Sequence, residues 1–297
     1  MAIFDPHVIA RIEQLELRAR RLVEGFLIGI HRSPYHGIST DFAEHRHYVQ
    51  GDDTRHLDWK IYARSDRFYV KKYEQDTNLE ATFLVDCSRS MFFASDDAPT
   101  TKYEYAATLV ASLAYLLHRQ RDAVGLTLFD DRIRQALPPR ASLAHYRHLV
   151  ETLETATPGE DTALGGALRK LGLQLARRGL VIVVSDFLDE INPLAEALSL
   201  HDCEGNEVIL FRVEDPAERT FPFGGPSVLL GLEREAKITC DPRDLRQDYL
   251  AQRARHVAEL HEACRKHSFL LEEAPTDSPA EDVLQGFLNL RGELFRR

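Results

Sequence analysis

Three short segments of this chain carry hydroxyl and carboxylate side chains at spacings that suit a metal ion. The first is the run Asp86-Cys87-Ser88-Arg89-Ser90, which directly follows an apolar stretch. In an extended segment the side chains at i, i+2 and i+4 point the same way, so we expect Asp86, Ser88 and Ser90 on one side. Oxygen ligands without nitrogen or sulfur suit a hard cation, Mg²⁺ first, with Mn²⁺ or Ca²⁺ as alternatives.

The other two segments supply a second carboxylate and a third hydroxyl. Asp186 closes the run LVIVVSD, and Thr162 lies in GEDTAL at 159–164, where a helix is expected to begin. Thr162, or the aspartate before it, is also expected to be the N-cap of that helix. Ligands in open α/β sheets bind beyond the carboxyl ends of the strands, so we expect the three segments to converge on one point. The alternative is ordinary structure, in which the strand-end aspartates and Thr162 only cap helices.

The elements that must position these residues alternate along the chain. Short, nearly all-apolar runs predict buried strands at 81–86, 123–129, 180–186, 207–213 and 269–273. Apolar residues at helical spacing predict helices at 101–119, 142–155, 163–177, 192–200, 243–267 and 281–293. An antiparallel edge strand is expected at 132–138 and further strands near 68–74, 227–231 and 236–240, the last two after an irregular stretch. This alternation predicts an α/β fold with a mostly parallel sheet flanked by helices.

Composition and charge exclude several classes of protein. The chain has 297 residues, 44% of them hydrophobic, and a formal net charge of −10. An acidic balance argues against nucleic acid as the main partner, because phosphate binding needs a basic face. The four scattered cysteines indicate no disulfide scaffold, and no apolar run approaches the length of a transmembrane helix. We therefore expect a cytoplasmic protein without membrane insertion.

The three oxygen-bearing segments resemble the loops of the metal-ion-dependent adhesion site in von Willebrand factor A domains. The matching motifs are DCSRSM, the threonine of GEDTALGGAL, and VVSDF. The resemblance implies that Ser88, Ser90 and Thr162 touch the metal, whereas Asp86 and Asp186 mostly hold its water ligands. It also implies that an acidic residue of a protein partner completes the coordination.

The segment before the first buried strand contains the block GDDTRHLDWKIYAR at 51–64. This block resembles the signature of a bacterial family called domain of unknown function 58. The resemblance covers nearly the whole chain. Before the block, apolar residues at roughly helical spacing from Val8 to Leu22 predict an amphipathic surface helix. We therefore expect this helix and the irregular and β block over 1–77, a von Willebrand A-like domain over 78–215, and a helical extension over 216–297 that completes the fold. Relatives commonly accompany MoxR-type AAA+ ATPases, which implies a role as a partner of such an ATPase. The matching residues are Gly37, Phe42, Arg46, Tyr48, Gly51, Asp52, Asp53, Arg55, Asp58, Trp59, Ala63, Arg64, Lys71 and Lys72.

Charged residues of this block are sufficient for a network of arginine–carboxylate pairs. Guanidinium and carboxylate groups pair in a bidentate geometry, and an aromatic side chain is expected to pack against them. Such a network either ties an added subdomain to the sheet or forms a partner-binding surface. The histidines of the same block show no zinc-ligand spacing. The expected members of the network are Arg46, Asp52, Asp53, Arg55, Asp58, Trp59 and Arg64.

Missing motifs narrow the function further. The sequence has no GxxxxGK[ST] phosphate-binding loop and no GxGxxG dinucleotide fingerprint. Its motifs offer carboxylates but no nucleophile with a recognisable activating base. We therefore expect a non-enzymatic, metal-dependent protein-interaction module. The alternatives are a Mg²⁺- or Mn²⁺-dependent hydrolase that acts on phosphoesters through the same site, and a scaffold that holds no cation in the cell.

Overall fold

The chain is built as two units. Gly29–Asn78 forms the smaller unit, and Met1–Ile28 together with Leu79–Arg297 forms the larger one. Among the residues that the structure describes, every helix belongs to the larger unit. The structure is a computed structural model that describes residues 15–24, 45–47, 69–71, 79–159, 161–175, 178–231 and 237–294.

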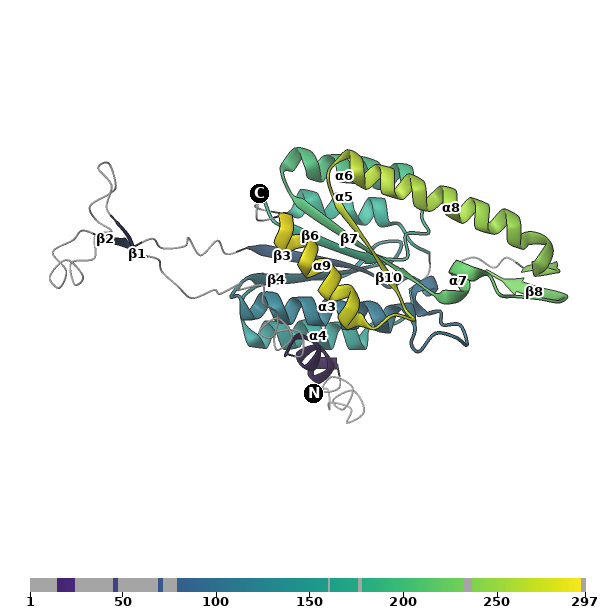
Figure 1. Ribbon diagram of the computed structural model, residues 1–297, viewed down its shortest axis with the longest axis horizontal. Coiled ribbons are helices and arrows are strands. Elements are labelled where there is room, and N and C mark those ends of the chain that lie inside the picture. The colour runs from purple at the N-terminus through teal and green to yellow at the C-terminus, as the bar shows by residue number, and fades with distance from the viewer. Residues whose placement is uncertain are drawn as a thin grey trace. The chain divides into compact units, whose positions relative to one another are not determined.

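A six-stranded sheet forms the centre of the larger unit (Figure 1). In order across the sheet, its strands are β10 (Leu270–Pro275), β7 (Glu207–Glu214), β6 (Leu180–Ser185), β3 (Glu80–Asp86), β4 (Ala123–Phe129) and β5 (Ile133–Arg140). Neighbouring strands are parallel, except that β5 runs antiparallel to β4 at the edge. The predicted α/β fold with a mostly parallel sheet is therefore confirmed.

The inner strands are apolar because both of their faces are covered. Every residue of β6 is buried, as are all residues of β3 and β4 after the first. Parallel strands in this position carry near-continuous apolar runs rather than alternating ones. Along β3, Phe83 and Val85 belong to one core and Leu84 to the other. The apolar runs that predict the strands thus reflect two cores, one on each face of the sheet.

Helices cover both faces of the sheet (Figure 1). One core lies between the sheet and three helices, α3 (Lys102–Arg119), α4 (Leu143–Thr155) and α9 (Ala280–Leu294). The other core lies between the sheet and α5 (Leu164–Gln174), α6 (Ile191–Glu204) and α8 (Pro242–Lys266). Strands that follow such crossovers all end at the same edge of the sheet.

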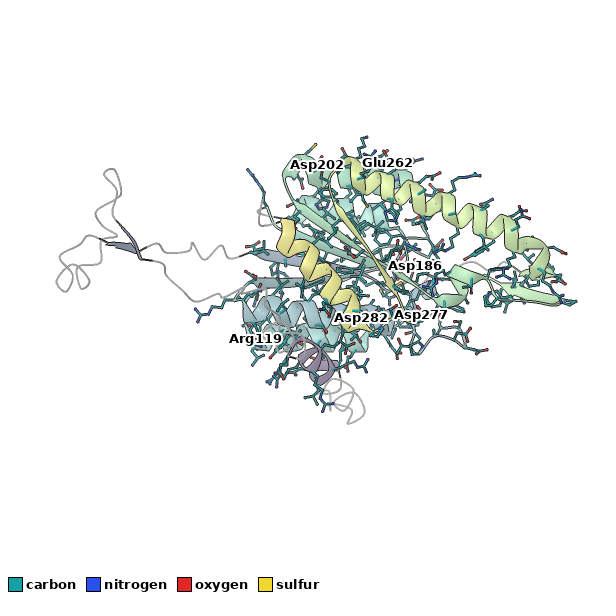
Figure 2. All side chains as sticks on the ribbon, in the orientation of Figure 1. Arg119, Asp186, Asp202, Glu262, Asp277 and Asp282 are labelled. Carbon is teal, nitrogen blue, oxygen red and sulfur yellow. The ribbon has the colours of Figure 1, made fainter. Side chains whose placement is uncertain are left out.

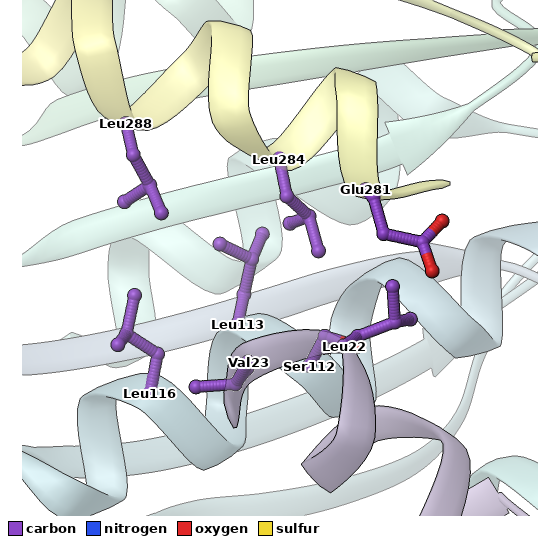
Figure 3. A pocket seen from close by; sticks show the side chains of 8 residues that line it. All are labelled: Leu22, Val23, Ser112, Leu113, Leu116, Glu281, Leu284 and Leu288. Atoms are coloured by element: carbon purple, nitrogen blue, oxygen red, sulfur yellow. The ribbon is translucent and has the colours of Figure 1, made fainter. Parts of the chain in front are cut away.

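The helix over residues 15–24 packs on the same side of the sheet as α3 and α9. Figure 3 shows Leu22 and Val23 of this helix lining a small cavity together with Leu113 of α3 and Leu284 of α9. The amphipathic pattern predicted for the N-terminal segment therefore reflects a buried apolar face in the larger unit.

The longest described helix, α8, is charged rather than apolar. Its buried side chains are Pro242, Leu260, Ala263 and Cys264. Within the described ranges, no helix combines the length and the apolar character that crossing a membrane requires.

A short helix and a two-stranded ribbon follow β7. The helix is α7 (Pro216–Thr220), and the ribbon pairs β8 (Ser227–Leu230) with β9 (Lys237–Cys240) in antiparallel fashion. The sequence predicts both strands but only an irregular stretch before them, and α7 corrects that prediction. Asp215 is the N-cap of α7 and Glu218 completes a capping box, with proline at the first helical position. That signature is visible in the sequence.

In the smaller unit the structure describes two short strands. β1 (His45–His47) pairs antiparallel with β2 (Tyr69–Lys71), and His45 lies opposite Lys71. β2 falls inside the strand predicted near 68–74.

Candidate metal centre

The two strand-end aspartates lie where the connections of the sheet change direction. Asp86 is the last residue of β3, and Asp186 directly follows β6. These strands are neighbours, but the chain continues from β3 to β4 on one side and from β6 to β7 on the other. Open α/β sheets bind ligands at such a switch point, at the carboxyl ends of the strands. Figure 2 labels Asp186 at this edge.

The Asp86 carboxylate joins the three predicted segments. It is fully buried, and its Oδ1 accepts a hydrogen bond from the backbone N–H of Ser88 at 2.8 Å. Its Oδ2 accepts hydrogen bonds from the hydroxyls of Thr162 at 3.1 Å and Ser185 at 2.7 Å. Thr162 lies in the loop before α5, and Ser185 ends β6, directly before Asp186. The segments that were expected to converge therefore meet at this carboxylate.

Electrostatics at Asp86 favour a nearby positive charge. Burial removes the hydration of the carboxylate, and this effect, followed by the negative charge of Asp186, raises the pKa of Asp86 from 3.8 to about 6. Hydrogen bonds from Ser88 and Ser185 lower the pKa but do not cancel these effects. A cation beside the two carboxylates would offset both the burial and the repulsion.

The Ser88 and Ser90 hydroxyls are buried and lie 3.1 Å apart. The sequence predicts an extended segment here, whereas the structure has Ser88 as the N-cap of a 3₁₀ helix, η2 (Arg89–Phe92). The chain turns because the Asp86 carboxylate accepts the Ser88 N–H, which is the pattern of an Asx turn. This turn, rather than strand alternation, brings the two hydroxyls together.

The arrangement of hydroxyls fits a small, hard cation. The Ser88 and Ser90 hydroxyls form a hydrogen bond with their oxygens 3.1 Å apart. Neighbouring ligand oxygens in an octahedral Mg²⁺ site with bonds of about 2.1 Å are about 3.0 Å apart, so a cation could replace this hydrogen bond with little movement of the two oxygens. In the part of the chain that the structure describes, no group of three or more His, Cys, Asp or Glu side chains is placed to hold a metal. A cation here would therefore depend on the hydroxyl oxygens. It stays a prediction that a cation binds here and that its site is made by Asp86, Ser88, Ser90, Thr162 and Asp186.

Backbone hydrogen bonds hold the loop that carries Thr162. The N–H of Gly159 donates to the carbonyl of Cys87 at 2.7 Å, just after β3. The N–H of Ala163 donates to the carbonyl of Asp130 at 3.0 Å, just after β4. The loop is therefore attached on both sides of Thr162 to the edge of the sheet.

The N-terminus of α5 is capped from outside its own segment. The sequence predicts Thr162 or its preceding aspartate as N-cap, but Ala163 occupies that position and makes no side-chain cap. Instead, the carboxylate of Asp189 accepts the N–H of Leu164 at 3.0 Å. Asp189 lies in the loop after β6, so this hydrogen bond joins two of the converging segments. The Thr162 hydroxyl is therefore not the cap of α5 and instead donates its hydrogen bond to Asp86.

The site also contains a lysine that no sequence motif marks. Nζ of Lys102, in the first turn of α3, donates a hydrogen bond to Oδ2 of Asp186 at 2.8 Å and also pairs with Glu218 of α7. Burial alone would lower the pKa of Lys102, but the two carboxylates outweigh burial and raise it above its ordinary value. The sequence contains a weak signal for this pairing, because a lysine in the first turn of a helix is unfavourable unless acidic groups compensate its charge.

The residue after Asp186 has a strained backbone. Phe187 has a φ of 54°, in the left-handed region that favours glycine, although its side chain is buried. Its N–H donates to the hydroxyl of Ser185 at 3.0 Å, and its carbonyl accepts a hydrogen bond from Nε2 of His256 at 2.6 Å. His256 lies on α8, so α8 contacts the loop that carries Asp186.

The predicted arginine–carboxylate network is described only at one position. Arg46 lies in β1, opposite Val70 of β2. The network stays a prediction, because its other members lie outside the described residues; these are Asp52, Asp53, Arg55, Asp58, Trp59 and Arg64.

Comparisons with known proteins identify sequence relatives over most of the chain. The sequence model of the family described as "Protein of unknown function DUF58" matches residues 44–259. The uncharacterized protein Rv1480 of Mycobacterium tuberculosis is 30% identical to this chain over 273 residues, which are 89% of this chain and 83% of the relative. The uncharacterized protein Mb1516 of Mycobacterium bovis matches with the same identity and the same coverage.

Solved structures are similar at lower sequence identity. The conserved hypothetical protein BatB from Bacteroides thetaiotaomicron is 17% identical, with a TM-score of 0.47 over 72% of this chain and 99% of that one. The VWA domain of SpRpn10 is 15% identical, with a TM-score of 0.41 over 69% of this chain and 94% of that one.

Proposed function

The chain belongs to the protein family of unknown function DUF58, and from that premise we propose that it is a non-enzymatic protein-interaction module that binds a divalent cation at Asp86. The proposed cation is Mg²⁺, with Mn²⁺ or Ca²⁺ as alternatives. One observation carries the proposal: Ser88, Thr162 and Ser185, from three separate segments, all donate hydrogen bonds to this one buried carboxylate.

The proposed roles follow from the chemistry of the side chains. Ser88, Ser90 and Thr162 would offer hydroxyl oxygens, and Asp86 and Asp186 would supply the negative charge. When bound, the cation would be the largest local charge and would attract a carboxylate. An acidic side chain of a protein partner would therefore complete the coordination, as in a metal-ion-dependent adhesion site.

The hydrogen bonds of the two carboxylates favour binding over hydrolysis. A general base must be able to take a proton from the attacking water. Both oxygens of Asp86 already accept hydrogen bonds, and Oδ2 of Asp186 accepts one from Lys102. Oδ1 of Asp186 could face a water that the cation holds, but its described hydrogen-bond partner is the backbone N–H of Leu188, which cannot carry a proton away. We therefore propose that the cation serves recognition rather than the hydrolysis of phosphoesters.

The partner that we propose first is a MoxR-type AAA+ ATPase, because the sequence resemblance implies one. Near the site, Leu188 is an apolar side chain that is 55% exposed. It lies two residues after Asp186 and would add an apolar contact beside the charged one. We therefore propose that the partner presents a carboxylate to the cation and an adjacent apolar group to Leu188.

The cation can be tested on the full chain with Mg²⁺ as the probe. We expect isothermal titration calorimetry to detect Mg²⁺ binding by the wild type and its loss in the double variant Ser88→Ala/Ser90→Ala. The matched control is Ser112→Ala, which also removes a buried hydroxyl but lies on α3 outside the site. Equal Mg²⁺ binding by the double variant, or none by the wild type, would contradict the proposal.

The partner can be tested at constant Mg²⁺, because an AAA+ ATPase itself uses the ion with its nucleotide. We expect a purified MoxR-type ATPase from the same genome to bind the wild type and Ser112→Ala, but not Ser88→Ala/Ser90→Ala, in a surface-binding assay. A screen with p-nitrophenyl phosphate covers the hydrolase alternative. Turnover with Mg²⁺ or Mn²⁺ that disappears in Asp86→Asn would favour an enzyme instead.

A further inference from the structure

We propose that Lys102 is a positioning residue that makes the cation site prefer Mg²⁺ over Ca²⁺, by holding one oxygen of Asp186. The inference rests on the cation site proposed above and concerns its selectivity. Its basis is a salt bridge of 2.8 Å between Nζ of Lys102 and Oδ2 of Asp186, whose side chains are 0% and 1% exposed.

The salt bridge leaves one oxygen of Asp186 for other ligands. Oδ2 is bound to the ammonium of Lys102, and the hydrogen bond that Oδ1 accepts within the described part of the chain is a long one, at 3.4 Å, from the N–H of Leu188. A cation, or a water molecule that a cation holds, would therefore meet Asp186 through Oδ1. Bidentate binding by this carboxylate would bring the cation against the ammonium of Lys102, and the repulsion between the two positive charges opposes it.

The other carboxylate is restrained in a similar way. Oδ1 of Asp86 accepts the N–H of Ser88, and Oδ2 accepts the hydroxyls of Thr162 and Ser185. With these hydrogen bonds in place, Oδ2 of Asp86 has no lone pair left for an ion, and the ammonium of Lys102 opposes the approach of an ion to Oδ2 of Asp186. The site is thus limited to single oxygens from each group.

Single oxygens suit Mg²⁺ better than Ca²⁺. Mg²⁺ is small, takes six ligands in near-ideal octahedral geometry and keeps several waters. Ca²⁺ takes about six to eight oxygens at longer distances and commonly binds carboxylates through both oxygens. A restraint that keeps Asp186 monodentate therefore lowers the affinity of the site for Ca²⁺ more than its affinity for Mg²⁺. Two of the restraints on the carboxylates come from side chains that are not proposed ligands, Ser185 on Asp86 and Lys102 on Asp186, and Lys102 is the charged one.

Lys102 is itself held in place, so the restraint is rigid. Its ammonium also pairs with Glu218, whose carboxylate accepts the N–H of Asp215 at 3.1 Å in the capping box of α7. The backbone carbonyl of Glu218 accepts a hydrogen bond from the Tyr249 hydroxyl of α8 at 3.0 Å. α7 and α8 therefore fix the far side of the ammonium.

The test must separate the restraint from the charge of the lysine. In the double variant Lys102→Met/Glu218→Gln, one positive and one negative charge are lost, so the net charge around Asp186 is unchanged while Oδ2 is released. The control Glu218→Gln changes the charge but keeps the salt bridge to Asp186. The probes are Mg²⁺ alone and Ca²⁺ alone, titrated calorimetrically into the full chain.

We expect the wild type and Glu218→Gln to bind Mg²⁺ more tightly than Ca²⁺ by a similar factor. In the double variant we expect that factor to fall about tenfold, the lower end of the effects measured for groups that orient metal ligands. An unchanged factor would overturn this inference alone. A wild type that binds Ca²⁺ more tightly than Mg²⁺ would also overturn the inference, and this measurement does not depend on the folding of any variant. No Mg²⁺ binding by the wild type would overturn the proposed function as well.

Discussion

The ammonium of Lys102 lies 2.8 Å from Oδ2 of Asp186, and both side chains are buried. Removing one partner of such a pair leaves the other charge buried without compensation. We expect Lys102→Met to lower the free energy of unfolding of the metal-free protein by about 3–5 kcal/mol, the range for breaking a buried pair. Urea denaturation of the full chain measures this. A loss below about 1 kcal/mol, the range of surface pairs, would contradict the buried pairing.

The contribution of Asp86 to the stability of the metal-free protein should fall as the pH rises from about 4 to about 6. In this window the folded protein, where the pKa of Asp86 is about 6, binds a proton that the unfolded chain, with a pKa of 3.8, has lost. Since the folded state binds more protons, raising the pH disfavours it until both states are ionised. The difference of about two pKa units corresponds to an effect on the order of 3 kcal/mol.

The substitution Asp86→Asn removes this titration. We expect it to raise the melting temperature of the metal-free protein at pH 7 and to flatten the pH dependence of stability between pH 4 and 6. Thermal melts in a chelator, compared with the wild type at each pH, provide the measurement. If the variant is less stable than the wild type at pH 7, the ionised Asp86 carboxylate does not destabilise the folded metal-free protein, and the prediction is wrong.

A methyl group at Gly159 should displace the loop that carries Thr162. A Cβ at this position would lie 2.5 Å from Oδ2 of Asp130 and 2.6 Å from its Cβ. We expect Gly159→Ala to cost about 1–3 kcal/mol of stability, as overpacking does, and to weaken Mg²⁺ binding. The matched control is Gly166→Ala on α5, where a Cβ meets nothing within 4 Å. That control should gain about 0.5–1 kcal/mol, because glycine inside a helix is unfavourable.

The cap from Asp189 should support both the fold and the site. Asp189→Ala removes the acceptor for the N–H of Leu164, which lies 3.0 Å away, and a lost N-cap costs about 1 kcal/mol. Because the same hydrogen bond joins the Thr162 loop to the loop after β6, Mg²⁺ binding should weaken too. Asp189→Asn keeps an acceptor oxygen and should retain most of the stability. Equal losses in both variants would argue against the cap.

Features with a strong local signal were predictable from the sequence. β4 spans Ala123–Phe129 as predicted, and β5 is the expected antiparallel edge strand. The sequence does not predict the turn after Asp86, because the pattern Asp86-Cys87-Ser88-Arg89-Ser90 also fits the alternation of an extended strand, and the hydrogen bond from the Ser88 N–H to Asp86 forms the turn instead. The capping signature of α7 was present in the sequence but lies in a stretch rich in proline and glycine.

The elements and the oxygen-bearing residues at the strand ends were determined by the sequence itself, because apolar periodicity and residue type are properties of a short stretch of chain. Which side chains share the site was decided by the tertiary structure. Ser185 is 99 residues from Asp86, with which it hydrogen-bonds, and Lys102 is 84 residues from Asp186. Such pairs form only when the sheet and the packing of α3 bring distant segments together, and no local pattern records that packing.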